Sequence, residues 1–210
     1  MFLKKAEKSY FPKTIRKIGA AFALCALLLS STSCAASAKP EQSSSAGGSY
    51  ADIVIADYGT ITIALDSEAA PETVSNFISL AESGFYDGLT FHRIIEGFMM
   101  QGGSPDGSGS GGSGTTIIGE FSSNGYNNTL SHTRGTVSMA RATDYNSASS
   151  QFFIVQADST YLDGDYAAFG RVTSGMEIVD QICADAQPID GNGSIAPDAQ
   201  PVIESITIHA

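Results

Sequence analysis

The sequence is poor in cysteine and in basic residues, and each shortage excludes a class of protein. Only three cysteines occur, Cys25, Cys34 and Cys183, so the fold cannot depend on a set of disulfides. Of the eleven basic residues, six lie within the first seventeen positions, and after Cys34 there are five basic and 21 acidic residues. This part therefore carries a net charge of −16. Binding to nucleic-acid phosphates needs clustered Lys and Arg, so we expect no nucleic-acid partner.

Motifs for a metal or a cofactor are also missing. The three histidines, His92, His132 and His209, are too scattered in sequence to form a metal motif. The glycine-rich run 102–116 contains G-x-G-x-x-G twice, but no helix pattern follows it and it lacks the lysine of a phosphate loop. We expect no metal and no cofactor, and we predict that this run forms a long surface loop. No nucleophile elbow occurs either, which disfavours a hydrolase that uses Ser, His and Asp.

The first 33 residues have the pattern of a secretory signal. Six basic residues precede an apolar run of twelve residues, 18–29. A helix of twelve residues is too short for a bilayer core of about 30 Å, which needs roughly 20 residues, whereas twelve is a usual length for a signal peptide. We therefore predict a signal peptide over 1–33 and no internal membrane helix.

The end of this segment resembles the lipobox of bacterial lipoproteins, in which a cysteine is acylated after cleavage. Ser33 and Thr32 fit that pattern before Cys34, whereas Ser31 stands where an aliphatic residue is usual. The resemblance implies lipidation at Cys34 and a lipoprotein anchored outside the cytoplasm, in a bacterial cell envelope. The alternative is an ordinary signal peptide that is cut after an A-x-A-like site such as 35–37, so that Cys34 is lost. Residues 35–49 are small and polar, which predicts that 34–49 is an acylated cysteine followed by a flexible tether.

From residue 50 onward the hydrophobic pattern predicts many short strands and two helices. Alternating Ile and Leu residues over 53–65, interrupted at 57–59, predict two strands joined by a turn. Pro71 suits the first position of a helix, and Gly84 suits its end. A second helix is expected over 175–183, because Ser174 and Glu177 have the spacing of a capping box. The alternation at Ile206 and Ile208 predicts a closing strand. This pattern favours a mainly β fold, an antiparallel barrel or sandwich with helical caps.

Several segments of the chain resemble the cyclophilin family of peptidyl-prolyl isomerases. They occur in the family's order and at its separations, and the resemblance covers essentially all of 51–208. The segments are GFYDGLTFHR within 84–93, FHRIIEGFMMQGG at 91–103, SMARA at 138–142, QFFI at 151–154 and YLDGDYAAFG at 161–170. The resemblance implies an eight-stranded antiparallel β-barrel capped by two α-helices for the domain 50–210, and it implies peptidyl-prolyl cis-trans isomerase activity.

The resemblance also assigns the site. Arg93 matches the catalytic Arg, which donates a hydrogen bond to the proline nitrogen as the X-Pro bond twists. Taken alone, Arg93 could equally be the ion-pair partner of Glu96 on a surface loop. The matching substrate-binding residues are Phe98, Met99, Gln101, Ala140, Arg141, Gln151, Phe153, Leu162, Tyr161 and Tyr166. Among these, Ala140 and Arg141 match a segment that binds the peptide through its main chain.

Four positions depart from the most familiar family pattern. Arg141 replaces a common Asn, which should be tolerated if only the main chain binds the peptide, and Glu96 replaces a common Pro. Tyr161 replaces the Trp of members that bind cyclosporin well, and Tyr166 replaces their His. We therefore expect isomerase activity together with weak cyclosporin binding.

The expected function is isomerisation of X-Pro bonds in unfolded or exported proteins, so that the protein assists folding outside the cytoplasm. Its expected partners are proline-containing peptide segments, and the membrane through the lipid on Cys34; the expected form is a monomer. The alternative is a binding module, a holdase or adhesin that uses the same fold without catalysis. The presence of Arg93 favours the enzyme, because binding alone would not require it.

Overall fold

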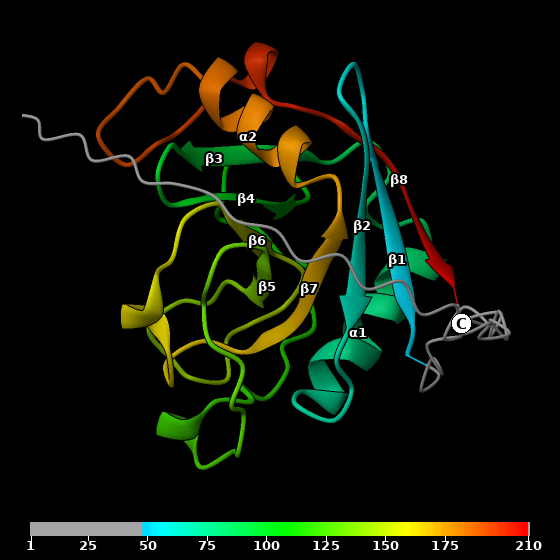
Figure 1. Ribbon diagram of the computed structural model, residues 1–210, viewed down its shortest axis with the longest axis vertical. Helices are drawn as coiled ribbons and strands as arrows, with labels where there is room; N and C mark the ends of the chain where they lie inside the picture. The colour runs from blue at the N-terminus through cyan, green and yellow to red at the C-terminus, as the bar shows by residue number, and fades with distance from the viewer. Residues whose placement is uncertain (1–47, 210) are drawn as a thin grey trace, which may run out of the picture. The chain divides into compact units, whose positions relative to one another are not determined.

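The computed structural model describes residues 48–209 (Figure 1). The predicted signal peptide, Cys34 and nearly all of the predicted tether lie outside these residues. Within the described range, the helices are all too short or too polar to span a lipid bilayer.

Eight strands form one antiparallel sheet. They occur in the order β3-β4-β6-β5-β7-β2-β1-β8, so that β3 and β8 are the edges. The strands are β1 Tyr50–Ile55, β2 Gly59–Leu65, β3 Thr90–Ile95, β4 Met99–Ser104, β5 Thr136–Met139, β6 Phe152–Val155, β7 Ala168–Ser174 and β8 Ile203–His209. Short 3₁₀ turns occur at Ser122–Asn124, Thr160–Leu162 and Pro197–Ala199.

The two edges of the sheet meet where β3 and β8 begin. Thr90 and Val202 form an isolated antiparallel bridge. The N–H of Phe91 donates to the carbonyl of Pro201 at 2.9 Å, and the N–H of Ile203 donates to the carbonyl of Leu89 at 2.8 Å. The curled sheet is thus joined at one end of its edges, and the predicted mainly β fold of eight antiparallel strands with two helices is confirmed.

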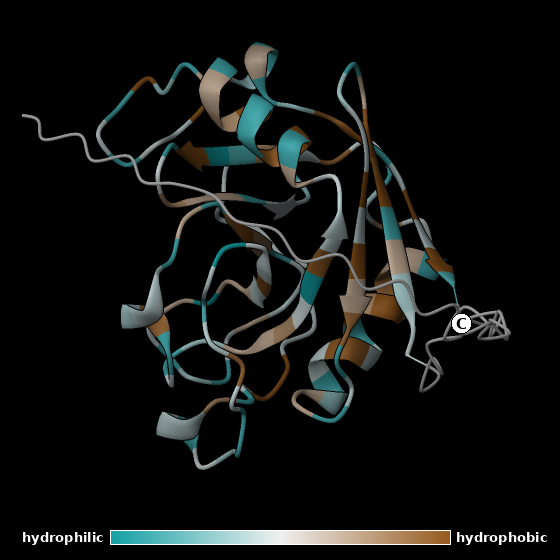
Figure 2. Ribbon diagram, viewed as in Figure 1, coloured by the Kyte–Doolittle hydropathy of each residue, from teal (hydrophilic) through white to brown (hydrophobic). Residues whose placement is uncertain are grey.

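The predicted opening hairpin is present, and its inward-facing residues form one side of the core. Ile53 pairs with Ile61 across β1 and β2, and both side chains are fully buried. Hydrophobic segments alternate with less hydrophobic ones along β1, β2 and β8 (Figure 2). The predicted closing strand is β8, in which Ile206 is buried and Ile208 packs against the core on the same face. Ile203 also faces inward, because the register with β1 shifts by one residue between Ile203 and Ile206. Such a bulge lets residues three apart face the same side.

Helix α1 (Pro71–Glu82) begins and ends where the sequence predicts. Gly84 adopts φ +72°, and its N–H donates to the carbonyl of Ala81 at 2.9 Å, while the N–H of Phe85 donates to the carbonyl of Leu80 at 3.0 Å. This pair of hydrogen bonds is the Schellman arrangement, which requires a left-handed residue and therefore favours glycine.

The N-terminus of α1 is capped by a residue 47 positions away. Ala70 at the N-cap offers no side-chain acceptor. The carboxylate of Glu120, only 2% exposed, accepts hydrogen bonds from the N–H of Glu72 at 3.1 Å and from both the N–H and the hydroxyl of Thr73, at 2.8 and 2.7 Å. A negative charge at this end also interacts favourably with the helix dipole.

Helix α2 (Met176–Asp185) is present, but the predicted capping box is wrong. Gly175, at φ +90°, is the N-cap residue, and no side chain caps the helix. Ser174 is instead the last residue of β7, where its main chain pairs with Thr62. The chain turns at Gly175 against β2, so closely that an added Cβ would lie 2.7 Å from the carbonyl oxygen of Thr60. Close packing of the turn, rather than a side-chain cap, therefore determines where α2 begins.

We predict that Glu120→Ala lowers the free energy of unfolding by about 2 to 4 kcal/mol, because three donors lose a charged acceptor inside the protein. Urea denaturation monitored by circular dichroism measures this change. The exposed Glu68→Ala provides a control that should stay within about 0.5 kcal/mol. Equal losses in the two variants would show that the buried cap contributes nothing.

Candidate active site

A row of side chains crosses three neighbouring strands on the face of the sheet that points away from the main core. Arg93 on β3 pairs with Gln101 on β4, and Gln101 pairs with Phe153 on β6. Because side chains alternate along a strand, the neighbours of these residues, Met100 and Phe152, point into the main core. The pairing of the strands therefore places an Arg, a Gln and a Phe side by side.

This face carries a second hydrophobic cluster, separate from the main core. Met99, Phe153 and Val155 form its buried part, and several partly buried residues pack against them, among them Phe98, Ala140, Leu162 and Tyr166. Together with the row they enclose a cavity of about 170 Å³, which we call the proline pocket after the ligand that the resemblance implies. Nine of the predicted site residues line it: Arg93, Phe98, Met99, Gln101, Ala140, Arg141, Phe153, Leu162 and Tyr166.

The two remaining predicted residues lie at the edge of this pocket. Gln151 lines a neighbouring cavity of about 380 Å³, which shares Gln101, Ala140 and Arg141 with the proline pocket. Tyr161 is 70% exposed, and its ring centroid lies 5.9 Å from that of Phe98. The structure thus brings every predicted binding residue to one region of the surface.

The guanidinium of Arg93 is held by neutral acceptors. Its Nε donates to the main-chain oxygen of Asn192 at 2.8 Å, and its Nη1 donates to Oε1 of Gln101 at 3.3 Å. Within residues 48–209 it forms no ion pair, so the alternative pairing with Glu96 is not found. Its Nη2 has no hydrogen-bond partner in the same range. The Nη2 donors of the guanidinium are therefore free to bind another group.

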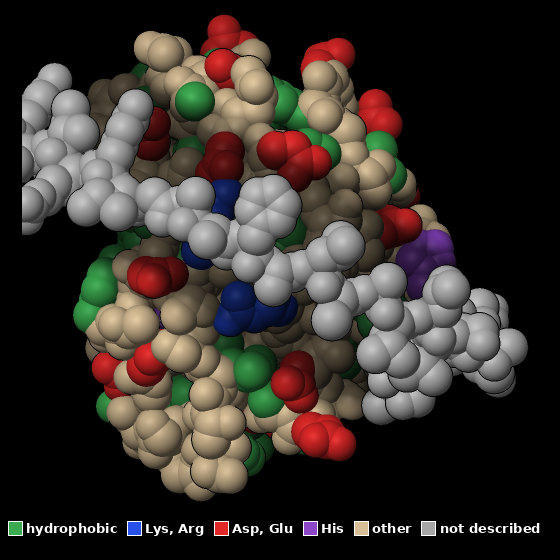
Figure 3. All heavy atoms as spheres, viewed as in Figure 1, with side chains coloured by type: hydrophobic (Ala, Val, Ile, Leu, Met, Phe, Trp, Pro, Cys, Tyr) green, Lys and Arg blue, Asp and Glu red, His purple; other side chains and the backbone are tan. Residues whose placement is uncertain are grey.

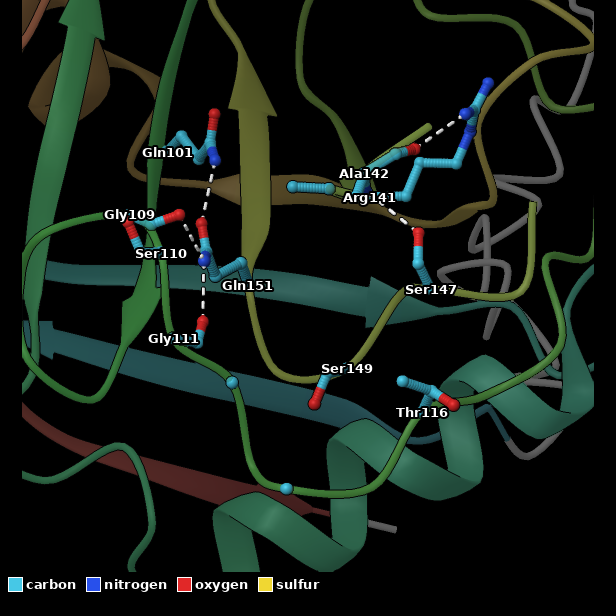
Figure 4. A pocket seen from close by; sticks show the side chains of 13 residues that line it. Gln101, Gly109, Ser110, Gly111, Thr116, Arg141, Ala142, Ser147, Ser149 and Gln151 are labelled. Atoms are coloured by element: carbon cyan, nitrogen blue, oxygen red, sulfur yellow. Dashed lines mark hydrogen bonds between the residues drawn. The ribbon is translucent and has the colours of Figure 1, made fainter. Parts of the chain in front are cut away.

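The orientation of Gln101 is fixed by a chain of amides that ends on the glycine-rich loop (Figure 4). Nε2 of Gln151 donates to the carbonyls of Gly109 at 3.0 Å and Gly111 at 2.7 Å. Carbonyls only accept, so Oε1 of Gln151 must face Gln101, whose Nε2 donates to it at 2.9 Å. Oε1 of Gln101 is then left for Arg93.

The predicted surface loop is confirmed, although it begins at Pro105 because residues 102–104 belong to β4.

The positive charges of the site are unusual in this acidic protein. Acidic side chains are spread over the face shown in Figure 3, whereas basic ones are few. Among the described residues Arg134 is the only arginine in an ion pair, with Asp180 at 2.6 Å. Burial lowers the pKa of Arg93, and Tyr166, Asp190 and Tyr161 partly oppose this effect. At any ordinary pH the guanidinium stays charged, so the pocket contains a cation that forms no ion pair with the described residues.

The structure gives the side chain of Arg141 a role that the sequence did not suggest. Its guanidinium carbon lies 4.8 to 5.2 Å from the ring centroids of Phe121, Tyr145 and Tyr166. Its Nε donates to the carbonyl of Asp165 at 2.8 Å. These contacts brace the pocket wall. The main-chain N–H and carbonyl of Arg141 have no partner within the described part of the chain, which leaves them available to a peptide.

A buried hydrogen-bonded triad behind the pocket was also missed. Nε2 of His132 lies 3.0 Å from the hydroxyl of Ser138, and its Nδ1 lies 2.9 Å from Asp163. The hydrogen bonds link Ser to His and His to Asp, as in the catalytic triad of a hydrolase. Ser138 is fully buried, however, so no substrate carbonyl can reach it. The imidazole instead stacks on Phe153, with ring centroids 6.0 Å apart and planes at 17°. This triad supports the pocket floor, and only tertiary proximity could have shown it.

The described residues contain no group of three or more His, Cys, Asp or Glu side chains placed to hold a metal ion. Cys183 is a buried thiol on α2, as expected of a small hydrophobic residue, and burial raises its pKa to about 12.

Comparison with known proteins gives consistent matches over this domain. A family model described as cyclophilin type peptidyl-prolyl cis-trans isomerase/CLD matches residues 50–208. Peptidyl-prolyl cis-trans isomerase B of Bacillus subtilis is 48% identical over 124 residues, which are 59% of this chain and 83% of that protein. A peptidyl-prolyl cis-trans isomerase of Helicobacter pylori is 44% identical over 126 residues, 59% of this chain and 74% of that protein.

Solved structures give the same match. A cyclophilin type peptidyl-prolyl cis-trans isomerase of Cryptosporidium parvum is 30% identical with a TM-score of 0.68, and the match covers 78% of this chain and 99% of that one. Its structure in the presence of the dipeptide Ala-Pro is 31% identical with a TM-score of 0.67 and the same coverage.

The buried triad predicts a dependence of stability on pH. Burial lowers the pKa of His132, although Asp163 partly opposes this. Below about pH 6.5, the ordinary pKa of His, the unfolded chain binds a proton that the folded protein binds less readily. The contribution of His132 to stability is therefore present above this pH, and it is lost as the pH falls through the lowered pKa.

The test compares wild type with His132→Gln by urea denaturation at about pH 7.5 and about pH 5. The free energy of unfolding changes by about 1.4 kcal/mol for each pH unit over which the unfolded chain binds one proton more than the folded protein. Between about pH 7.5 and about pH 5 it should therefore fall by about 1 kcal/mol less in His132→Gln than in wild type. The pKa of His92 is also lowered, by burial and by Arg93, but His92 is present in both proteins. An identical loss in both proteins would contradict the assignment to His132.

Proposed function

The chain belongs to the cyclophilin-type peptidyl-prolyl cis-trans isomerase family, and from this premise we propose that the proline pocket beside Arg93 is its active site. The observation that supports this most is the guanidinium of Arg93, which lies with Nη2 unengaged at a cavity of about 170 Å³ that the second hydrophobic cluster helps to line. The matched domain is an enzyme that accelerates rotation about X-Pro bonds.

The chemistry requires no bond to be broken. Rotation about a peptide bond is opposed by resonance between the nitrogen lone pair and the carbonyl, with a barrier of about 18 to 20 kcal/mol. At the twisted transition state this lone pair is localised on nitrogen and can accept a hydrogen bond. A donor that finds this acceptor only in the twisted state stabilises the transition state over the ground state. Nη2 of Arg93 is the donor we assign to this step.

The pocket provides the second requirement, which is to hold one side of the rotating bond. The proline ring fits against Phe98, Met99, Phe153 and Leu162, all of which line the pocket. The residue before proline lies over Ala140 and Arg141, whose main chain provides a free N–H and a free carbonyl. With the ring fixed, rotation moves the preceding carbonyl. The solved relative crystallised in the presence of Ala-Pro supports a proline-containing ligand.

We also propose that cyclosporin binds weakly. Tyr161 occupies the position where strongly binding relatives have Trp, and its phenol provides neither the larger ring nor the indole N–H donor. Tyr166 lines the pocket in the place of a His. Isothermal titration with cyclosporin measures this directly, and it is independent of the rate of isomerisation. Tight binding would contradict it.

The cellular role is a separate proposal. We infer that Cys34 is acylated and anchors a monomeric domain outside the cytoplasm of a bacterium, where it acts on proline-containing segments of unfolded or exported proteins. The support is the sequence of residues 1–49: a basic start, an apolar run of twelve residues, and a cysteine after small residues.

Labelling the full chain with a fatty-acid analogue in a bacterial host should therefore give a lipidated protein in the membrane fraction. Cys34→Ala should abolish both the label and the membrane fractionation. A soluble, unlabelled wild-type protein whose N-terminus lies beyond Cys34 would instead support the ordinary signal peptide.

The direct test of the active site is the rate of isomerisation of a short X-Pro peptide. Arg93→Ala should lower kcat/KM by on the order of a hundredfold or more, as expected when one positioned donor to a transition state is removed. Arg93→Lys keeps the charge but not the planar fork of donors, and it should fall between wild type and Arg93→Ala. Arg171→Ala is the matched control, since Arg171 is exposed and, among residues 48–209, its guanidinium donates only to the carbonyl of Arg134 and the hydroxyl of Thr133. Peptide binding, followed by NMR titration, should change much less than the rate in Arg93→Ala. Binding without acceleration by the wild-type protein would support the non-catalytic binding module.

A further inference from the structure

The edge of β3 that does not pair with β4 is covered, beside Arg93, by a hairpin for which the sequence gives no pattern. Residues 188–195 fold back on themselves, with a bridge between Pro188 and Ile195. In Figure 1 they belong to the orange segment that follows α2. The N–H of Ile195 donates to the carbonyl of His92 at 2.9 Å, and the N–H of Ile94 donates to the carbonyl of Gly193 at 2.8 Å. These two bonds dock the hairpin on either side of Arg93.

The turn of this hairpin is organised by the carboxylate of Asp190. Its Oδ1 accepts hydrogen bonds from the N–H of Asn192 at 2.9 Å and from the N–H of Ser194 at 3.0 Å. Gly193 completes the turn at φ +85°, and an added Cβ there would clash with the side chain of Ile95. The carboxylate therefore determines where the peptide unit that follows Asn192 is placed.

That peptide unit is the one that holds the catalytic side chain. The main-chain oxygen of Asn192 accepts from Nε of Arg93 at 2.8 Å, the shorter of the two bonds that the guanidinium makes to oxygen. A guanidinium is planar and rigid, so fixing Nε on one side and Nη1 on the other determines the direction of Nη2. Loss of the Nε bond would leave only contacts of Nη1, to Oε1 of Gln101 at 3.3 Å and to the sulfur of Met99 at 3.9 Å.

We propose that Asp190 is a positioning residue for the isomerisation: its carboxylate shapes the 188–195 hairpin so that the carbonyl of Asn192 orients the guanidinium of Arg93 toward the proline pocket. This proposal rests on the proposed function of Arg93. Asp190 acts through the main chain of Asn192, and it does not line the proline pocket. Its own charge is a different effect, because an anion near Arg93 would act whether or not the hairpin keeps its shape.

Two substitutions separate shape from charge. Asp190→Asn keeps an oxygen that can accept from Asn192 and Ser194 while it removes the charge. Asp190→Ala removes both. Asp66→Ala is the matched control, since Oδ1 of Asp66 also accepts from two main-chain N–H groups, those of Glu68 and Ala69, outside the site.

We expect Asp190→Ala to lower kcat by about tenfold with KM nearly unchanged, because a small displacement of a catalytic group is costly while the pocket itself is intact. Asp190→Asn and Asp66→Ala should keep most of the wild-type rate. In the Arg93→Ala background, Asp190→Ala should cause no further loss, since a residue that acts through Arg93 has nothing left to position. The NMR signal of the Arg93 Nε–H should shift and exchange faster with solvent in Asp190→Ala than in Asp190→Asn.

The results that would overturn the proposal are distinct. Equal losses in Asp190→Ala and Asp190→Asn would assign the effect to charge, and equal losses with and without Arg93 would assign it to general stability. Full activity of Asp190→Ala would show that Gln101 alone orients the guanidinium. If Arg93→Ala itself keeps the wild-type rate, the proposed role of Arg93 fails, and that outcome is separate from any result for Asp190. Thermal unfolding of each variant identifies one that does not fold. If Asp190→Ala does not fold, the test uses Asp190→Asn and the Nε–H signal of Arg93 in the wild-type protein. A wild-type Nε–H that exchanges with solvent as fast as a free guanidinium contradicts the proposal.

Discussion

The site depends on the register of three antiparallel strands. Pairing of β3 with β4 and of β4 with β6 places Arg93, Gln101 and Phe153 in one row. A slip of one residue in any of these pairs would turn every side chain of that strand to the opposite face. The row would then enter the main core, where the Phe77 and Phe152 rings already pack with centroids 5.5 Å apart. The burial of the main core therefore selects the same register that builds the pocket on the other face.

The guanidinium of Arg93 is hydrogen bonded to neutral groups rather than paired directly with an anion. A partly buried cation is costly unless it is well hydrogen bonded, and a carboxylate would satisfy it most strongly. An ion pair would also occupy the donors that a substrate needs. The guanidinium instead donates to the carbonyl of Asn192 and the amide of Gln101, and it keeps one donor nitrogen free. The 188–195 hairpin orients Arg93 directly, through the carbonyl of Asn192. The glycine-rich loop does so indirectly, because its carbonyls hold Gln151, which in turn holds Gln101.

Long-range polar contacts stabilise the loops that surround this site. Glu120 caps α1 from the segment before the first 3₁₀ turn, and Asp163 ties the segment that carries Tyr161 and Leu162 to His132. Asn76 on α1 donates to the carbonyl of Ser149 at 2.7 Å, close to Gln151. In each case a side chain satisfies main-chain or buried polar groups that lie far away in sequence, because buried polar groups without partners are costly. The pocket walls are loops, and these contacts give them fixed positions on a rigid sheet.

The sequence by itself determined the elements whose causes are local. The alternation over 53–65, Pro71 and Gly84 at the ends of α1, and the many short strands follow from side-chain periodicity and backbone preference, and the matched motifs named the residues of the pocket. What the sequence did not determine is how distant segments satisfy one another. The capping box of α2 was predicted wrongly because Ser174 belongs to β7, where its main chain pairs with Thr62. The cap from Glu120, the triad of Ser138, His132 and Asp163, the aromatic contacts of Arg141, and the hairpin against Arg93 all join residues that are separated in sequence and have no periodic signal. Only the folded chain brings them into contact, and the tertiary structure alone decided which donor of Arg93 remains free.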